Sequence, residues 1–146
     1  MSQQKFQVEI PPDFKPAQRR ELGDLIIEHI FDRTDRGLDK NGKKFPGYSE
    51  SYVKSLDFSN AGKSKGNVNL QLSGDMLAAM ELLNEKRGKI TIGFEKGTEE
   101  NAKAEGNITG SYGKPTGNAK KARDFLGIEG SKLRELINYV RSNSKS

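Results

Sequence analysis

The sequence predicts an α+β fold in which a long N-terminal helix, a middle helix and a C-terminal helix pack on a small antiparallel sheet, with a long extended loop outside the core. Two segments alternate polar and apolar residues with the period of a strand, and three others repeat apolar residues with the period of a helix. The 146 residues suit one domain, so residues 1–146 are expected to fold as a single unit. Leu, Ile, Val and Phe make up roughly 22% of the chain, just above the level of about 20% below which chains stay disordered, so the core must be small.

Strands are expected at residues 5–10 and 89–94. In each of them the apolar side chains fall on alternate positions and therefore share one face of the sheet. They are Phe6, Val8 and Ile10 in the first strand and Ile90, Ile92 and Phe94 in the second. The pair Pro11-Pro12 ends the first strand, because proline cannot donate a ladder hydrogen bond.

The longest predicted helix covers residues 16–34, with Pro16 near its first turn, where proline is tolerated. Its stripe at three- and four-residue steps consists of Leu22, Leu25, Ile26, His29, Ile30 and Arg33. A middle helix is expected after Ser73, a good N-cap residue, with a stripe of Met76, Leu77, Met80 and Leu83. A C-terminal helix is expected after Ser131, with a stripe of Leu133, Leu136, Ile137 and Val140.

Residues 95–124 are predicted to form a long polar loop. Five glycines punctuate this stretch, and its only sizeable apolar side chains are Ile108 and Tyr112. A loop of this length in a compact domain is normally functional or disordered.

Three shorter segments are predicted between the first and middle helices. Asn41-Gly42 is typical of a turn and not of a calcium loop, because Gly37 and Tyr48 occupy the positions where such a loop needs carboxylates. Residues 50–58 are compatible with a short helix, and residues 61–69 with a polar loop.

The residue types that catalysis and metal binding require are scarce. The absence of Cys excludes disulfides, thiolate zinc sites and cysteine nucleophiles. The single histidine, His29, has Ile26 and Ile30 as helical neighbours and is expected at the edge of the core. Carboxylate pairs such as Asp32 with Asp35 lie in polar stretches, where nothing desolvates them to raise a pKa. The chain is therefore expected not to be an enzyme and to need no metal or cofactor.

The sequence carries no membrane signal. Its apolar runs are far shorter than the roughly 20 residues that span a bilayer, and the polar start Met1-Ser2-Gln3-Gln4 lacks a signal-peptide pattern. We expect a soluble chain that is made in the cytoplasm and has no membrane partner.

The net charge of +5 is concentrated in the last third of the chain, where residues 101–146 hold 9 basic and 4 acidic side chains. One interpretation is contact with nucleic acid, with Tyr112 near a cluster of cations. The candidate contacts are Lys114, Lys120, Lys121 and Arg123. The other interpretation is a solvated face that aids solubility.

Three segments, in this order, resemble the phage virion morphogenesis (tail completion) family. The first is 41–49 with Tyr52 and Lys54; the second is 72–77, leading into Ile90-Thr91-Ile92-Gly93; the third is 122–128, before the final helix. The sequence departs from the family pattern at Asp124, where proline is usual, and at 101–106, where the family has a different motif.

This resemblance implies a non-enzymatic virion protein at the neck that joins the head to the tail of a tailed phage. Its partners would be a ring of six or twelve copies of itself, other neck, head-completion or tail proteins, and DNA in passing. Residues 95–124 would order on contact with these neighbours. The side chains expected to hold the fold or the subunit interface are Phe45, Tyr48, Met76, Leu77, Ile108, Tyr112, Phe125 and Leu126.

Two rival functions follow from the residues without the resemblance. One is a basic accessory protein that binds nucleic acid through the cations near Tyr112. The other is a small toxin or inhibitor that binds a host protein through residues 95–124.

Overall fold

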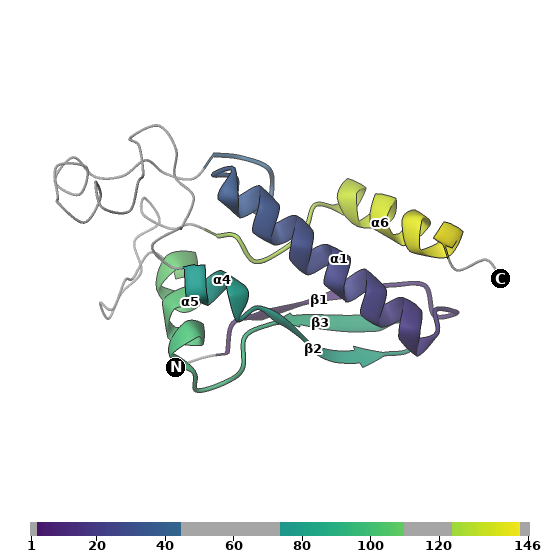
Figure 1. Ribbon diagram of the computed structural model, residues 1–146, viewed down its shortest axis with the longest axis horizontal. Helices are drawn as coiled ribbons and strands as arrows, with labels where there is room; N and C mark the ends of the chain where they lie inside the picture. Colours follow the sequence, from purple (N-terminus) through teal and green to yellow (C-terminus); the bar gives the residue numbers. More distant parts are fainter. Residues whose placement is uncertain (1–2, 45–73, 110–123, 144–146) are drawn as a thin grey trace, which may run out of the picture.

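The computed structural model describes residues 3–44, 74–109 and 124–143, and these residues form the predicted α+β fold (Figure 1). Their sheet is antiparallel with the strand order β1-β3-β2. The strands are β1 (Lys5–Glu9), β2 (Glu81–Lys86) and β3 (Lys89–Gly93). The helices are α1 (Pro16–Asp35), α4 (Gly74–Ala78), α5 (Glu99–Thr109) and α6 (Gly130–Asn143).

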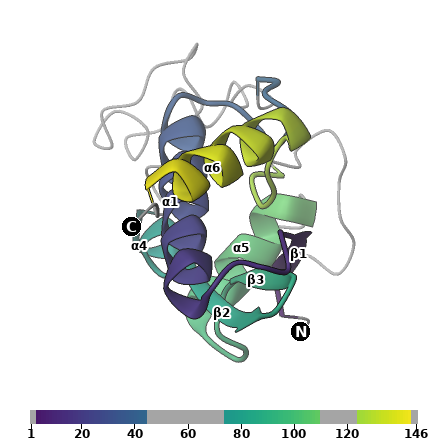
Figure 2. The same cartoon turned by 90° about the vertical axis from the view of Figure 1, so that its right-hand side faces the viewer.

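The elements form three layers, with α1 between the sheet and α6 (Figures 1 and 2). Helices α4 and α5 pack on each other at one end of the sheet. The largest fully buried apolar side chains come from α1, α4, β3, α6 and the segments that follow β3 and precede α6: Leu22, Ile26, Ile30, Met76, Ile90, Ile92, Phe94, Phe125 and Val140. The small core therefore draws on segments from both ends of the chain.

The predicted strands at 5–10 and 89–94 are confirmed as β1 and β3. They pair directly, with Val8 opposite Ile90 and Phe6 opposite Ile92, so the alternating apolar side chains meet on the core face. Lys5, Gln7 and Glu9 are exposed on the opposite face.

The strand β2 contradicts the predicted extent of the middle helix. Only Gly74–Ala78 is helical, and Leu83 lies in β2 instead of continuing the stripe. A β-bulge shifts the register between Leu82 and Asn84, so the strand lacks the simple alternation that would have revealed it. The hairpin to β3 turns at Gly88, whose φ of 82° favours glycine.

The helix α5 contradicts the predicted loop at 95–124 over residues 99–109. Its core face carries small and amide side chains in place of large apolar ones, with Asn101, Ala104, Gly106 and Asn107 buried. Thr98 Oγ1 accepts the backbone N–H of Asn101, and Asn107 donates to the carbonyl of Lys103. A helix with hydrogen-bonded amides on its core face has no apolar stripe to predict it from.

The helices α1 and α6 occupy almost the predicted residues. Gln18 closes the start of α1 by accepting the N–H of Lys15, and Pro16 occupies the first turn. Helix α6 begins at Gly130, so Ser131 lies inside the helix and the predicted N-cap is wrong. Glu129 precedes the helix instead, and its carbonyl accepts the N–H of Leu133 at 2.9 Å.

The far end of α6 is fixed to the start of α1. Arg141 Nη1 lies 2.9 Å from Asp13 Oδ2, and its guanidinium carbon lies 5.1 Å from the ring centre of Phe14. The Asp13 pKa is lowered, mainly by the hydrogen bond from Arg141.

The predicted turn at Asn41-Gly42 is present. Asp39 Oδ1 accepts the N–H groups of Asn41 and Lys43 at 2.9 Å each, and Gly42 has a φ of 80°. The short helix predicted at 50–58 and the loop at 61–69 lie outside the described residues.

None of the helices in the described part of the chain is both long and apolar enough to cross a membrane.

Gly93 provides a test of the sheet. A Cβ at this position would lie 2.6 Å from Lys5 Cα, on the backbone of the neighbouring strand. We expect Gly93→Ala to lower the free energy of unfolding by about 1–3 kcal/mol in urea titrations, because neither strand can move aside freely. Gly130→Ala is the matched control, since a Cβ there meets only the Arg134 side chain at 3.5 Å. Equal stability of the two variants would contradict the strand pairing.

Candidate functional site

The structure buries four of the predicted interface side chains inside the subunit. Met76 and Phe125 have no exposed surface, and Leu77 and Leu126 are also buried. Ile108 is half-buried and packs on the same core. These residues hold the fold, and the four buried ones present almost no surface to a second subunit in this conformation.

The remaining predicted site residues lie outside the described part of the chain. These are the interface candidates Phe45, Tyr48 and Tyr112 and the nucleic-acid candidates Lys114, Lys120, Lys121 and Arg123.

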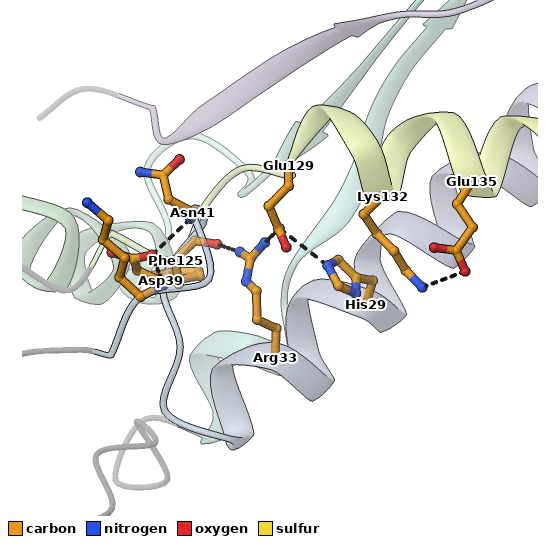
Figure 3. Close-up of polar contacts among 9 residues, drawn as sticks. His29, Arg33, Asp39, Asn41, Phe125, Glu129, Lys132 and Glu135 are labelled. Atoms are coloured by element: carbon orange, nitrogen blue, oxygen red, sulfur yellow. Dashed lines mark hydrogen bonds and ion pairs between the residues drawn. The ribbon is translucent and has the colours of Figure 1, made fainter.

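The most constrained polar cluster joins the end of α1 to the segment before α6. Arg33, whose side chain is 1% exposed, donates from Nη1 to Glu129 Oε1 and from Nη2 to the carbonyl of Phe125, both at 2.6 Å. We call Arg33, Phe125 and Glu129 the Arg33 anchor. Figure 3 shows the Arg33 guanidinium between the other two residues, with His29 approaching Glu129 from one turn earlier on α1.

A second set of contacts holds the same segment from the loop after α1. The Lys40 N–H donates to the carbonyl of Asp124 at 3.0 Å, and Lys40 Nζ lies 2.8 Å from Asp124 Oδ2. Gly127 faces the Lys40 side chain, since a Cβ there would lie 3.0 Å from Lys40 Cδ. Asp124 thus forms an ion pair with Lys40.

Phe125 connects the Arg33 anchor to the sheet. Its ring meets that of Phe94, the residue that follows β3, edge to face with 6.1 Å between centroids and 79° between planes. The carbonyl of Phe125 thus binds Arg33 while its side chain fills the core.

Burial and charge compete at the Arg33 anchor. Burial is the largest influence on the pKa of Arg33 and lowers it, although the hydrogen bond to Glu129 opposes the change. Burial tends to raise the pKa of Glu129, but backbone hydrogen bonding and Arg33 outweigh it, so this pKa is lowered. Glu129 therefore stays ionised beside the guanidinium at neutral pH.

His29 lies at the edge of the core, as predicted. Its Nε2 is 3.4 Å from Glu129 Oε1. Burial lowers the pKa of His29 below its ordinary value of 6.5, and this outweighs the opposing effect of Glu129. The imidazole is therefore neutral at pH 7.

The polar contacts of this cluster stabilise the fold. Its ionisable side chains bind one another, and Arg33 has almost no surface with which to reach a substrate. No group of three His, Asp or Glu side chains within the described ranges is placed to hold a metal ion. The arrangement fixes the segment before α6 to α1.

The position of Arg33 in the sequence indicated that its side chain could be buried, although a charged residue is normally expected at the surface. Arg33 continues the apolar stripe of α1 one turn after His29, where a charged side chain must either reach solvent or find a buried partner. Nothing in the sequence identified Glu129 as that partner, since 96 positions separate the two residues.

Comparison with family models, with curated proteins and with solved structures found no match for the chain.

Replacement of Arg33 tests the anchor. We expect Arg33→Met to lower the free energy of unfolding by about 2–4 kcal/mol, because the change leaves Glu129 and the Phe125 carbonyl without their donor. The double variant Arg33→Met/Glu129→Met should regain part of the loss, since it leaves neither charge alone. Arg134→Met, at an exposed position of α6, is the control and should change stability by less than about 0.5 kcal/mol. An Arg33→Met chain as stable as this control would contradict the anchor.

The lowered pKa of His29 predicts an acid-sensitive fold. The unfolded chain takes up the His29 proton near pH 6.5, before the folded chain does, so stability should decline as the pH falls below that value. The lowered pKa of Glu129 adds a further decline below its ordinary value of 4.5. His29→Gln should flatten the first decline in urea titrations between pH 7 and pH 5. An unchanged slope in this variant would show that His29 contributes nothing to it.

Proposed function

We propose that this chain is a structural virion protein of a tailed phage, a tail completion or neck connector subunit that assembles as a ring and joins the head to the tail. The proposal has no catalytic step and no cofactor. The observation that carries it is the ordered set of three segments that resemble the phage virion morphogenesis family.

The positions of the resembling residues in the fold support this proposal. From the second segment, Met76 and Leu77 are buried in the core, and Gly93 has no room for a side chain beside β1. From the third, Phe125 is fully buried and Gly127 packs on Lys40. A resemblance that reflects a common fold should concentrate on such constrained positions, whereas a chance resemblance has no reason to.

The subunit contacts in this proposal come from Phe45, Tyr48 and Tyr112. Aromatic side chains are enriched at the centres of protein interfaces. A closed ring of six or twelve copies pairs one patch of each subunit with a different patch of the next. Of the predicted loop, we assign residues 110–123, which follow α5 and include Tyr112, to these contacts, together with Phe45 and Tyr48.

The alternative function is a nucleic-acid-binding accessory protein, and the excess of basic residues in 101–146 favours it. The contacts would be Lys114, Lys120, Lys121 and Arg123. Phosphate contacts of this kind give an affinity that falls steeply with salt.

The first test is assembly. Light scattering should give the mass of a ring, either for the chain alone or after mixing with head or tail proteins of the phage that encodes it. Mass spectrometry of purified virions should also detect the chain. A chain that stays monomeric with every such protein and is absent from virions would overturn the proposal.

Two sets of variants separate the alternatives. Tyr48→Ala/Tyr112→Ala should weaken assembly and leave DNA binding unchanged if the chain is a neck subunit. Lys120→Gln/Lys121→Gln should weaken DNA binding in a low-salt gel shift and leave assembly unchanged if the chain is a nucleic-acid-binding protein. Melting temperatures equal to that of the wild type would show that each variant folds.

A further inference from the structure

The strand β1 lies at one border of the sheet (Figure 2), and its outer side pairs with no other described strand. The N–H of Ile10 bonds to the Gly88 carbonyl, and the N–H of Phe94 bonds to the Gln4 carbonyl. Because backbone groups of an antiparallel pair alternate in direction, Phe6 and Val8 direct theirs at β3. Lys5, Gln7 and Glu9 therefore direct their N–H and carbonyl groups outward, along the outer edge of the described sheet.

Edge strands avoid pairing through bulges, internal prolines, charged side chains, short length or a covering element. Among the described residues, β1 is short and has charged side chains, but it lacks the two features that break a ladder directly, a bulge and an internal proline. The other border of the sheet has such a bulge, between Leu82 and Asn84 of β2. The outward-directed residues of β1 have opposite charges at the two ends, Lys5 and Glu9.

We infer that β1 pairs antiparallel with β1 of a second copy of this chain, about a two-fold axis at Gln7. Gln7 would then lie opposite Gln7, and Lys5 opposite Glu9 of the second copy, so that three outward residues of each strand form ladder hydrogen bonds. This register also brings two pairs of opposite charges together. A shift by two residues places Gln7 opposite Lys5 or Glu9 and loses both charge pairs, and a shift by one sets outward groups against inward ones.

The same register continues the apolar face of the sheet across the new junction. Phe6 is half-buried on the core face, and Val8 is buried beside it. In the two-fold pair, Phe6 lies opposite Val8 of the second copy at a position without hydrogen bonds, where side chains approach most closely. The pairing therefore covers surface of Phe6 that one subunit leaves exposed.

This contact differs from the ring contacts of the proposed function, because it joins identical patches and a closed ring joins different ones. The β1–β1 dimer can form whether or not the chain assembles as a ring. A five-residue strand buries less than the roughly 1,000 Å² of a stable interface, so the dimer should be weak and concentration-dependent.

Charge swaps at Lys5 and Glu9 test the pairing. Sedimentation equilibrium of the full chain over roughly 5–500 µM should show a monomer–dimer equilibrium. Lys5→Glu and Glu9→Lys should each raise the dimer dissociation constant about tenfold, because each creates two like-charge pairs in a two-fold dimer. A mixture of the two variants should dimerise at least as tightly as the wild type, since both pairs then join opposite charges. The double variant Lys5→Glu/Glu9→Lys should also regain a dissociation constant close to that of the wild type, because its pairs again join opposite charges.

Two further variants control for folding and for net charge. Lys96→Glu makes the same charge change as Lys5→Glu, but in the exposed loop after β3, and should leave the dimer dissociation constant unchanged. Gln7→Pro removes an outward N–H without removing a donor to β3, so it should abolish the dimer while circular dichroism and melting remain close to wild type. A wild-type chain that stays monomeric up to the highest concentration would overturn the inference, as would a dimer that the charge swaps leave unchanged.

Discussion

The guanidinium of Arg33 donates two hydrogen bonds of 2.6 Å, to Glu129 and to the carbonyl of Phe125, from a position that solvent hardly reaches. A charge in such a place is costly unless hydrogen bonds offset its burial, and both bonds of the Arg33 Nη atoms go to the segment before α6, while Nε has no partner. This conformation of α1 therefore depends on that segment being in place. That segment in turn places Phe125 against Phe94 at the end of the sheet. One side chain thereby links α1, α6 and β3.

The position of α6 follows from contacts at both of its ends. Among the described elements, α6 packs mainly on α1, which separates it from the sheet. Glu129 fixes its start through Arg33, and Arg141 fixes its end through Asp13 and Phe14. The Arg33 contact is buried and the Arg141 contact is exposed. The Arg33 contact should therefore contribute more to the stability of the packing between α1 and α6.

Periodicity alone located β1, β3, α1 and α6, because each buries large apolar side chains on a single face. It failed at β2, where the bulge after Leu82 breaks the alternation, and at α5, where Asn101 and Asn107 occupy core positions. The Arg33 anchor escaped prediction for another reason. Arg33 continues the apolar stripe of α1, but its partner Glu129 is far away in the sequence and looks like an ordinary surface charge until the fold brings the two together.

These observations make residues 124–143 an integral part of one core held by Arg33, onto which the proposed assembly contacts are added. Hydrogen exchange of the native chain, followed residue by residue, tests this most directly. The amides of α6 around Leu136 and Val140 should exchange as slowly as those of α1 around Ile26, because both helices open only with the whole core. Fast exchange throughout α6 beside a protected α1 would show that the C-terminal helix opens independently and would contradict the role of Arg33.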